Sequence, residues 1–313
     1  MGVYIAKRIV AIVPIFLLAT LLTFGMIKLS PVDPAEAYFA ASNTHPTEEA
    51  LQQKREEFGL NKPLLIQYVN AVSNIVQLNF GQSYMTNKPV LDEVKVRLPT
   101  TIQLAICSIL LTIIVSIPIG FISGIRKNGL IDHISRLFSF IGASIPSFWF
   151  GYLLMLFFSV KLDLFPVQGT GTWLHLVLPS ITLALPFTVQ YSRMLRSNVL
   201  ENIEQPPILY AKMRGIHDLI IMLKYVLRMA IGPVITGLGM NLGMLLTGTI
   251  IVEVVFSLPG FGRYFIDAIF NRDMPVIQCY VLLSAVIYLL CNLVVDIIQM
   301  FVDPRIVKKG ELL

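Results

Sequence analysis

The sequence has few charged side chains for its length. Only 14% of its 313 residues are Asp, Glu, Lys or Arg, whereas 55% are hydrophobic. The mean hydropathy is +0.73. Soluble globular proteins carry about 25% charged residues. The composition therefore excludes an ordinary soluble domain and indicates a protein that crosses a membrane several times.

Groups that carry chemistry are also scarce. The three cysteines lie apart in apolar segments, without the spacing of a zinc site or a disulfide framework, and no P-loop is present. The sequence contains no HExxH motif and shows no ring of charges, so an intramembrane enzyme or an ion channel is a weaker alternative. We predict that the chain is not an enzyme and binds no metal. The net charge of +5 is scattered between apolar segments, which argues against nucleic acid as a partner.

Six apolar stretches are long enough, at about 20 residues each, to cross a bilayer as helices. The fourth carries Pro179 and Pro186, which neighbouring helices can accommodate. We expect an all-α integral membrane protein whose spans are approximately Ile9–Ile27, Thr101–Ile125, Leu137–Val160, Leu174–Val189, Met229–Phe256 and Val276–Val302.

Lysine and arginine are concentrated in alternate loops. They occur before the first span, after the second, after the fourth and in the tail, whereas the other short loops hold only Lys161, Arg263 and Arg272. Because basic residues favour the cytoplasmic side, we expect both termini and the loop 193–228 to be cytoplasmic.

The long segment 30–98 then lies outside the cell. Pro46–Phe58 has Glu48 and Glu49 in its first turn and Gly59 just beyond its end, which is typical of a helix. Leu64–Leu78 predicts a second, amphipathic helix. The segment is either a cap that packs on the spans or a docking surface for a partner.

The stretch Pro206–Arg228 is the longest basic segment between two apolar spans. Pro206 and Pro207 suit the first turn of a helix. Gly215 is placed where a left-handed residue would end that helix, and Asp218 can cap a second helix that begins at Leu219. The pattern predicts helix, glycine turn and helix, although a plain solvated loop has a similar composition.

The fifth span is rich in glycine, and Gly239 and Gly243 form a GxxxG pair that permits close helix approach. It also carries a polar and thioether stripe that either lines a translocation pathway or fills gaps in packing. The candidates are Met240, Asn241, Met244 and Thr247. Near the end of the span Glu253 is a further candidate, because a carboxylate there is costly unless paired or hydrated. Its alternative role is a structural hydrogen bond to the turn 259–262.

Several short motifs stand out along the chain. They are Gly59-Leu60-x-x-Pro63-Leu64-x-x-Gln67-Tyr68, Asn79-Phe80-Gly81-x-Ser83, Ala211-Lys212-Met213-Arg214-Gly215, Val252-Glu253-x-Val255-Phe256-x-x-Pro259-Gly260-x-Gly262, Asn271-Arg272-Asp273-x-Pro275 and Asp303-Pro304-Arg305-Ile306. Together they resemble the permease subunits of peptide/opine/nickel ABC importers, and the motif that ends at Gly215 is similar to the end of their coupling helix.

The resemblance covers essentially the whole chain and implies the type I ABC importer permease fold in a bacterial inner membrane. It implies a heterodimer with a second permease, two cytoplasmic ATPases that bind ATP and Mg, and an external substrate-binding protein. The ATPase-coupling residues it implies are Leu209, Tyr210, Ala211, Lys212, Met213, Arg214, Gly215, Ile216, His217 and Asp218. Leu209-Tyr210 departs from the Glu-Ala of importers at large.

The expected organisation is a first transmembrane helix (1–29), an external segment (30–98), a five-helix core (99–306) and a tail (307–313). Gln278-Cys279 and Cys291-Asn292 resemble the nickel branch. We therefore expect passage of nickel, as the ion or a small chelate. The alternative is a di- or oligopeptide, opine or metallophore permease.

Overall fold

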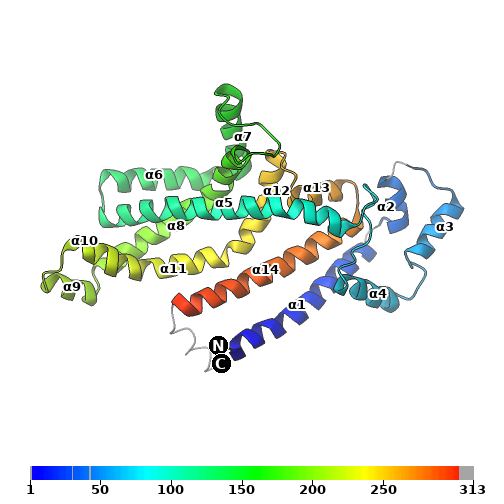
Figure 1. The fold of residues 1–313 in the computed structure, drawn as a ribbon, viewed down its shortest axis with the longest axis horizontal. Helices are drawn as coiled ribbons and strands as arrows, with labels where there is room; N and C mark the ends of the chain where they lie inside the picture. The colour runs from blue at the N-terminus through cyan, green and yellow to red at the C-terminus, as the bar shows by residue number, and fades with distance from the viewer. Residues whose placement is uncertain (1, 30, 42–43, 303–313) are drawn as a thin grey trace. The chain divides into compact units, whose positions relative to one another are not determined.

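The computed structural model describes residues 2–29, 31–41 and 44–302, most of which are helical (Figure 1). In these ranges the only bridge between extended segments pairs Gln82 with Pro89. The helices are α1 Gly2–Leu29, α2 Pro34–Ala41, α3 Glu48–Glu57, α4 Leu64–Val76, α5 Val90–Ile125, α6 Leu130–Ser144, α7 Ser147–Leu154, η1 Met155–Lys161, α8 Leu174–Ile203, α9 Pro206–Met213, α10 Asp218–Ile220, η2 Ile221–Val226, α11 Leu227–Met240, α12 Leu242–Val255, α13 Phe261–Phe270 and α14 Met274–Val302.

Four helices in the described residues are long and apolar enough to cross a membrane: Val90–Ile125, Leu174–Ile203, Asp218–Met240 and Met274–Val295. The number rises to six if each of two bent helix pairs crosses as one span. The six predicted spans therefore agree with the upper end of this range.

Two predicted spans are not continuous helices. Leu137–Val160 is divided at Ile145-Pro146, where α6 and the helix that follows it meet at 107°. Proline disfavours helix in the residue before it, which explains the break. Met229–Phe256 is interrupted at Asn241, and the apolar helix leading to it begins already at Asp218.

The chain divides into two compact units. The first comprises Met1–Thr101 and Pro259–Leu290, and the second comprises Ile102–Leu258 and Cys291–Leu313.

In the first unit, the two helices predicted in the external segment are confirmed as α3 and α4, whereas α2 was not predicted. The hydroxyl of Thr47 caps α3 by accepting from the backbone N–H of Ala50. The Tyr68 and Thr20 hydroxyls hydrogen-bond at 3.0 Å, so α4 packs on the first helix as a cap would.

In the second unit, α8 lies against α6, α7 and α11 (Figure 1). Small residues make these contacts possible. A Cβ atom at Gly142 on α6 would lie 2.7 Å from Cγ2 of Val189 on α8. One at Gly120 on α5 would lie 2.6 Å from the carbonyl oxygen of Ser192, also on α8. These two glycines therefore allow neighbouring helices to approach closely.

Candidate functional site

The short helix α9 is anchored through one face. Gln205 is extended before it, and prolines fill its first two positions, whose N–H groups would have no helical acceptor. Ile208 and Ala211 are buried, and they belong to a core cluster that includes Val199 and Ile221. Apolar burial at positions three residues apart therefore fixes which way the helix faces.

The opposite face of α9 is apolar and exposed. Leu209, Tyr210 and Met213 are 50%, 63% and 86% exposed. The guanidinium of Arg214 lies 5.8 Å from the centre of the Tyr210 ring. An apolar and aromatic patch of this kind on a connecting helix is a feature of protein-binding surfaces.

Gly215 ends α9 in the left-handed conformation, with φ of +73°, as predicted. Its N–H donates to the carbonyl of Lys212 at 2.9 Å, and the N–H of Ile216 donates to the carbonyl of Ala211 at 3.3 Å. This pair of bonds is a Schellman motif. Ile216 also packs against the core cluster that holds Ile208.

The next helix begins one residue earlier than expected. Asp218 is its first residue rather than its cap, and Nδ1 of His217 accepts from the N–H of Leu219 at 3.2 Å. Because α8 continues to Ile203 and the next apolar helix begins at Asp218, residues 193–203 and 218–228 of the predicted coupling loop are helical, and 204–217 connect the two long helices. The basic residues that suggested a longer loop lie on the ends of these helices.

The predicted pathway residues have different environments. Asn241 separates α11 from α12, and its side-chain amide donates to the Tyr191 hydroxyl at 2.8 Å. Met240 is 62% exposed, whereas Glu253 is completely buried. The side chains of Met244 and Thr247 lie outside the described part of the structure. The three candidates whose side chains are described, Met240, Asn241 and Glu253, therefore do not share one environment.

A buried ion pair was not predicted from the sequence. Arg196 on α8 donates from Nε and a terminal nitrogen to the two carboxylate oxygens of Asp132 on α6, at 2.5 and 2.9 Å. The N–H of Asn128 donates to the same carboxylate at 2.9 Å. The sequence contains one signal for this pair. Asp132 is the only acidic residue between Glu93 and Asp163, and an isolated carboxylate among apolar segments requires a partner.

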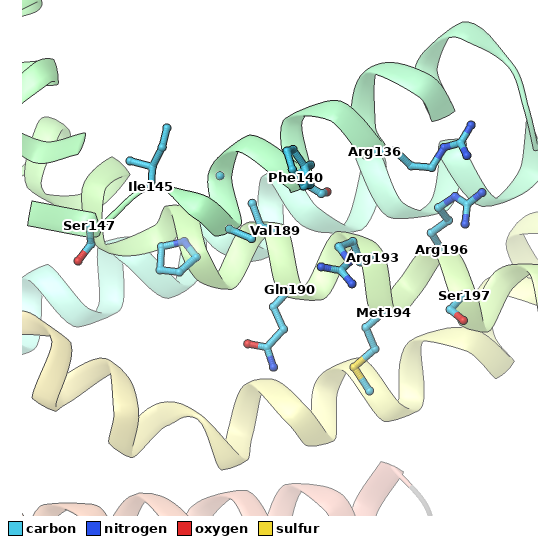
Figure 2. Close-up of a pocket in the computed structure, with 14 residues that line it drawn as sticks. Arg136, Phe140, Ile145, Ser147, Val189, Gln190, Arg193, Met194, Arg196 and Ser197 are labelled. Carbon is cyan, nitrogen blue, oxygen red and sulfur yellow. The ribbon is translucent and has the colours of Figure 1, made fainter. Parts of the chain in front are cut away.

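Beside this pair runs a groove of about 960 Å³ between α6 and α8 (Figure 2). Its lining includes Arg136 and Phe140 from α6, and Gln190, Arg193 and Arg196 from α8. Figure 2 shows Arg136 and Arg196 side by side toward one end, and Ile145 and Ser147 at the other.

Two family models together match most of the chain. Residues 116–308 match the binding-protein-dependent transport system inner membrane component family, and residues 1–105 match the N-terminal model for such membrane components. The chain belongs to this family.

Similar permeases align with this one over nearly its whole length. A probable peptide ABC transporter permease protein of Sinorhizobium fredii is 35% identical, covering 98% of this chain and 99% of the relative. The glutathione transport system permease protein GsiC of Pectobacterium atrosepticum is 35% identical over 97% of this chain and 98% of its own. The oligopeptide transport system permease protein AppB of Bacillus subtilis is 36% identical over 98% and 99%.

A solved structure supports the fold. A chain of the MetNI methionine ABC transporter, in an inward-facing conformation, superposes with a TM-score of 0.57 at 17% identity, covering 68% of this permease and 97% of that chain. The permease therefore has the type I ABC importer fold and is a multi-pass inner-membrane transport component rather than an enzyme. Importers of this family work with ATPase and substrate-binding protein partners.

The structure explains motifs in the segment that we predicted to be external. The Ser83 hydroxyl donates to the buried Asp273 carboxylate at 2.5 Å, which joins two motifs that are far apart in the sequence. The amide of Gln67 donates to the carbonyl of Leu60 at 2.9 Å and so holds the turn between α3 and α4.

No group of three or more His, Cys, Asp or Glu side chains in the described residues of the permease is arranged to hold a metal ion. Cys279 is buried, and Cys291 is partly buried. The two cysteines that suggested the nickel branch thus belong to no cluster of metal ligands within the ranges described.

Proposed function

We propose that this permease forms half of the translocation path of a peptide importer and transmits ATPase movement through α9. The observation that carries the coupling role is the two-faced geometry of α9. Ile208 and Ala211 fix one face in the core, while Leu209, Tyr210 and Met213 expose the other. A helix held in this way transfers force from a docked partner to α8 and α11 without losing its own position.

The assembly we propose contains a second, different permease, two cytoplasmic ATPases and an external substrate-binding protein. ATP and Mg bind the ATPases, and this chain holds neither. Both termini and α9 lie in the cytoplasm, because lysine and arginine concentrate in the segments on that side.

The substrate class we propose is a di- or oligopeptide rather than nickel. The relatives described above are named for peptides, glutathione and oligopeptides, and none of the three is named for nickel. Sequence features at Cys279 and Cys291 had favoured nickel. These thiols lack companion ligands among the described residues, so they supply no reason to prefer the metal.

Uptake by the reconstituted complex tests the substrate. Proteoliposomes with the binding protein and ATP should accumulate labelled di- and oligopeptides, and unlabelled peptide should compete. Radioactive nickel, with and without histidine as a chelator, is the comparison. Nickel uptake without peptide uptake would reverse the substrate assignment and leave the coupling role standing.

Labelling of single cysteines in intact cells tests the topology. A cysteine at Asn74 should react with a reagent that cannot cross the membrane, and a cysteine at His217 should react only after permeabilisation. Both positions are solvent-exposed, so accessibility within the folded chain does not bias the result. Equal labelling at the two sites would contradict the orientation.

A further inference from the structure

We propose that the groove between α6 and α8 is a binding site for one anionic phospholipid, with its phosphate at Arg193 and Arg136. This site is separate from the α9 surface and goes beyond peptide transport. The argument rests on the charge of the groove, on a buried hydroxyl without a partner and on the gradient of polarity along the two helices.

The groove carries more positive charge than its own acidic residue neutralises. Arg136, Arg193 and Arg196 line it, and Asp132 beside them is already bonded to Arg196. Arg136 lies further away, with Nε 3.8 Å from the Asp132 carboxylate. The Arg193 side chain makes no hydrogen bond or ion pair with the described residues. Such a site favours a phosphate, whose oxygens match the guanidinium geometry.

A buried hydroxyl lies at the same level of the groove. Ser139 is one of the lining residues, is only 3% exposed, and its oxygen has no hydrogen-bond partner among the described residues. It stands three positions after Arg136 on α6, so both side chains occupy the same helix face. Buried polar atoms without partners are uncommon. A phosphate oxygen bound by the arginines would accept from this hydroxyl.

The lining changes from basic to apolar along the groove. Arg136 and Arg196 lie at one end of the groove, and Ile145 lies at the other (Figure 2). Phe140, Ala143 and Val189 lie between them. A phospholipid would place its headgroup at the arginines and an acyl chain along the apolar part, so that each end of the groove meets a group of matching polarity. Basic pockets between transmembrane helices are known to hold anionic headgroups in this way.

Helices α6 and α8 both belong to candidate membrane spans, so lipid is available as the occupant we name. Free phosphate would satisfy the arginines and leave the apolar end empty. A protein segment of the partner permease would cover the apolar end without meeting the two cationic side chains, unless it carried acidic residues. A phospholipid matches both the basic and the apolar part of the lining, and the two rivals become outcomes of the test.

Lipid retention by the purified permease complex is the measurement. We would add phosphatidylglycerol or phosphatidylcholine to delipidated complex and count the bound lipids by native mass spectrometry. One phosphatidylglycerol should stay bound under conditions that remove phosphatidylcholine. Arg193→Gln should weaken its retention about fivefold, as expected for one basic residue near an anionic headgroup. Arg193→Lys should retain most of the affinity.

A matched control separates this site from general surface charge. Arg228 is also exposed, in the second unit, and lies outside the groove, so Arg228→Gln should leave retention unchanged. Ala143→Phe fills the apolar half while keeping both arginines and should also reduce retention. Glycerol phosphate, which lacks acyl chains, should not compete at equal concentration.

Three results would overturn the proposal. They are equal retention of the two lipids, no difference between Arg193→Gln and Arg228→Gln, and full competition by glycerol phosphate, which would indicate a free-anion site. A cysteine at Ser197 that crosslinks to the partner permease in the assembled complex would assign the groove to a protein interface instead. Peptide uptake measures none of these quantities, so the two proposals fail independently.

Discussion

Different kinds of interaction stabilise the interior of each compact unit. In the first, polar bonds connect segments that are far apart in the sequence, including Ser83 to Asp273 and Thr101 to Phe261. In the second, glycines allow whole helices into contact, as at Gly120 against Ser192 and Gly239 against Val295.

The difference follows from the surroundings of each segment. In lipid, helices gain little from hiding apolar side chains from each other, so close approach and dispersion drive their association. The segment 31–98 is largely polar, and directional bonds and aromatic contacts, such as the ring of Phe58 stacked on Tyr84 at 5.8 Å, fix its loops. The ion pair of Asp132 and Arg196 is an exception within the second unit.

Breaking the ion pair of Asp132 and Arg196 should cause the largest predicted loss of stability. Arg196→Gln would leave the fully buried Asp132 carboxylate without its principal partner. We expect a loss of about 3 kcal/mol in the free energy of unfolding, the low end of the range because Arg196 keeps 22% exposure. Unfolding of the purified permease in mixed detergent micelles measures it.

The double variant Asp132→Asn with Arg196→Gln is the control. Removing both charges avoids a buried unpaired carboxylate, so most of the stability should return. If the single and double variants were equally unstable, lost packing of the arginine stem rather than charge would be the cause.

Adding a side chain where a glycine lets two helices approach closely should cause the next largest loss of stability. A Cβ atom at Gly120 would meet a backbone oxygen that no rotamer change can move, so Gly120→Ala should cost about 2 kcal/mol. Gly25 also lies within a helix, but a Cβ atom there meets nothing within 4 Å. Gly25→Ala should be neutral or slightly stabilising. Similar unfolding curves for the two variants would contradict the packing argument.

Removing a hydrogen bond in the first unit should cause a smaller loss of stability. Ser83→Ala removes the hydroxyl bonded to Asp273, while the N–H of Met85 remains 3.3 Å from the same oxygen. Losing one hydrogen bond to a buried carboxylate should cost about 1.5 kcal/mol. Hydrogen exchange of the backbone around residues 83–87 should report the loosening. Ser73→Ala, at an exposed hydroxyl, should change nothing measurable.

The sequence predicted features that depend on one residue and its neighbours. The left-handed turn at Gly215 and the helix predicted over Pro46–Phe58, observed as Glu48–Glu57, are of this kind, because dihedral limits and the signals at helix ends are local. The apolar content of the spans also predicted the fold class, and the motif resemblance predicted the family.

Other features depend on residues far apart and escaped prediction. Asp132 and Arg196 are separated by 64 positions, and only the packing of α6 on α8 brings them together. The fifth span was begun too late because Lys224 and Arg228 suggested a loop, yet both lie on a continuous run of helical segments where their side chains stay exposed. Long basic side chains extend from such helices toward water.

The smallest predicted change in free energy tests the proposed coupling element. Gly215 has open space around it, so a new side chain there would clash with nothing, and only its φ of +73° resists substitution. Gly215→Ala should therefore destabilise the turn by about 1 kcal/mol, and Gly215→Val by more because its side chain is β-branched. Gly215→Asn should be close to the original protein in stability, since asparagine tolerates this conformation.

Co-purification of the ATPase subunits should decrease in the order Gly, Asn, Ala, Val at position 215. Peptide-stimulated ATP hydrolysis should lose its link to uptake in the same order. The effect on stability is small, but the turn sets the direction of Tyr210 and Met213 on α9, so docking should be more sensitive than folding. Unchanged ATPase binding and uptake in Gly215→Val would show that α9 does not transmit the movement.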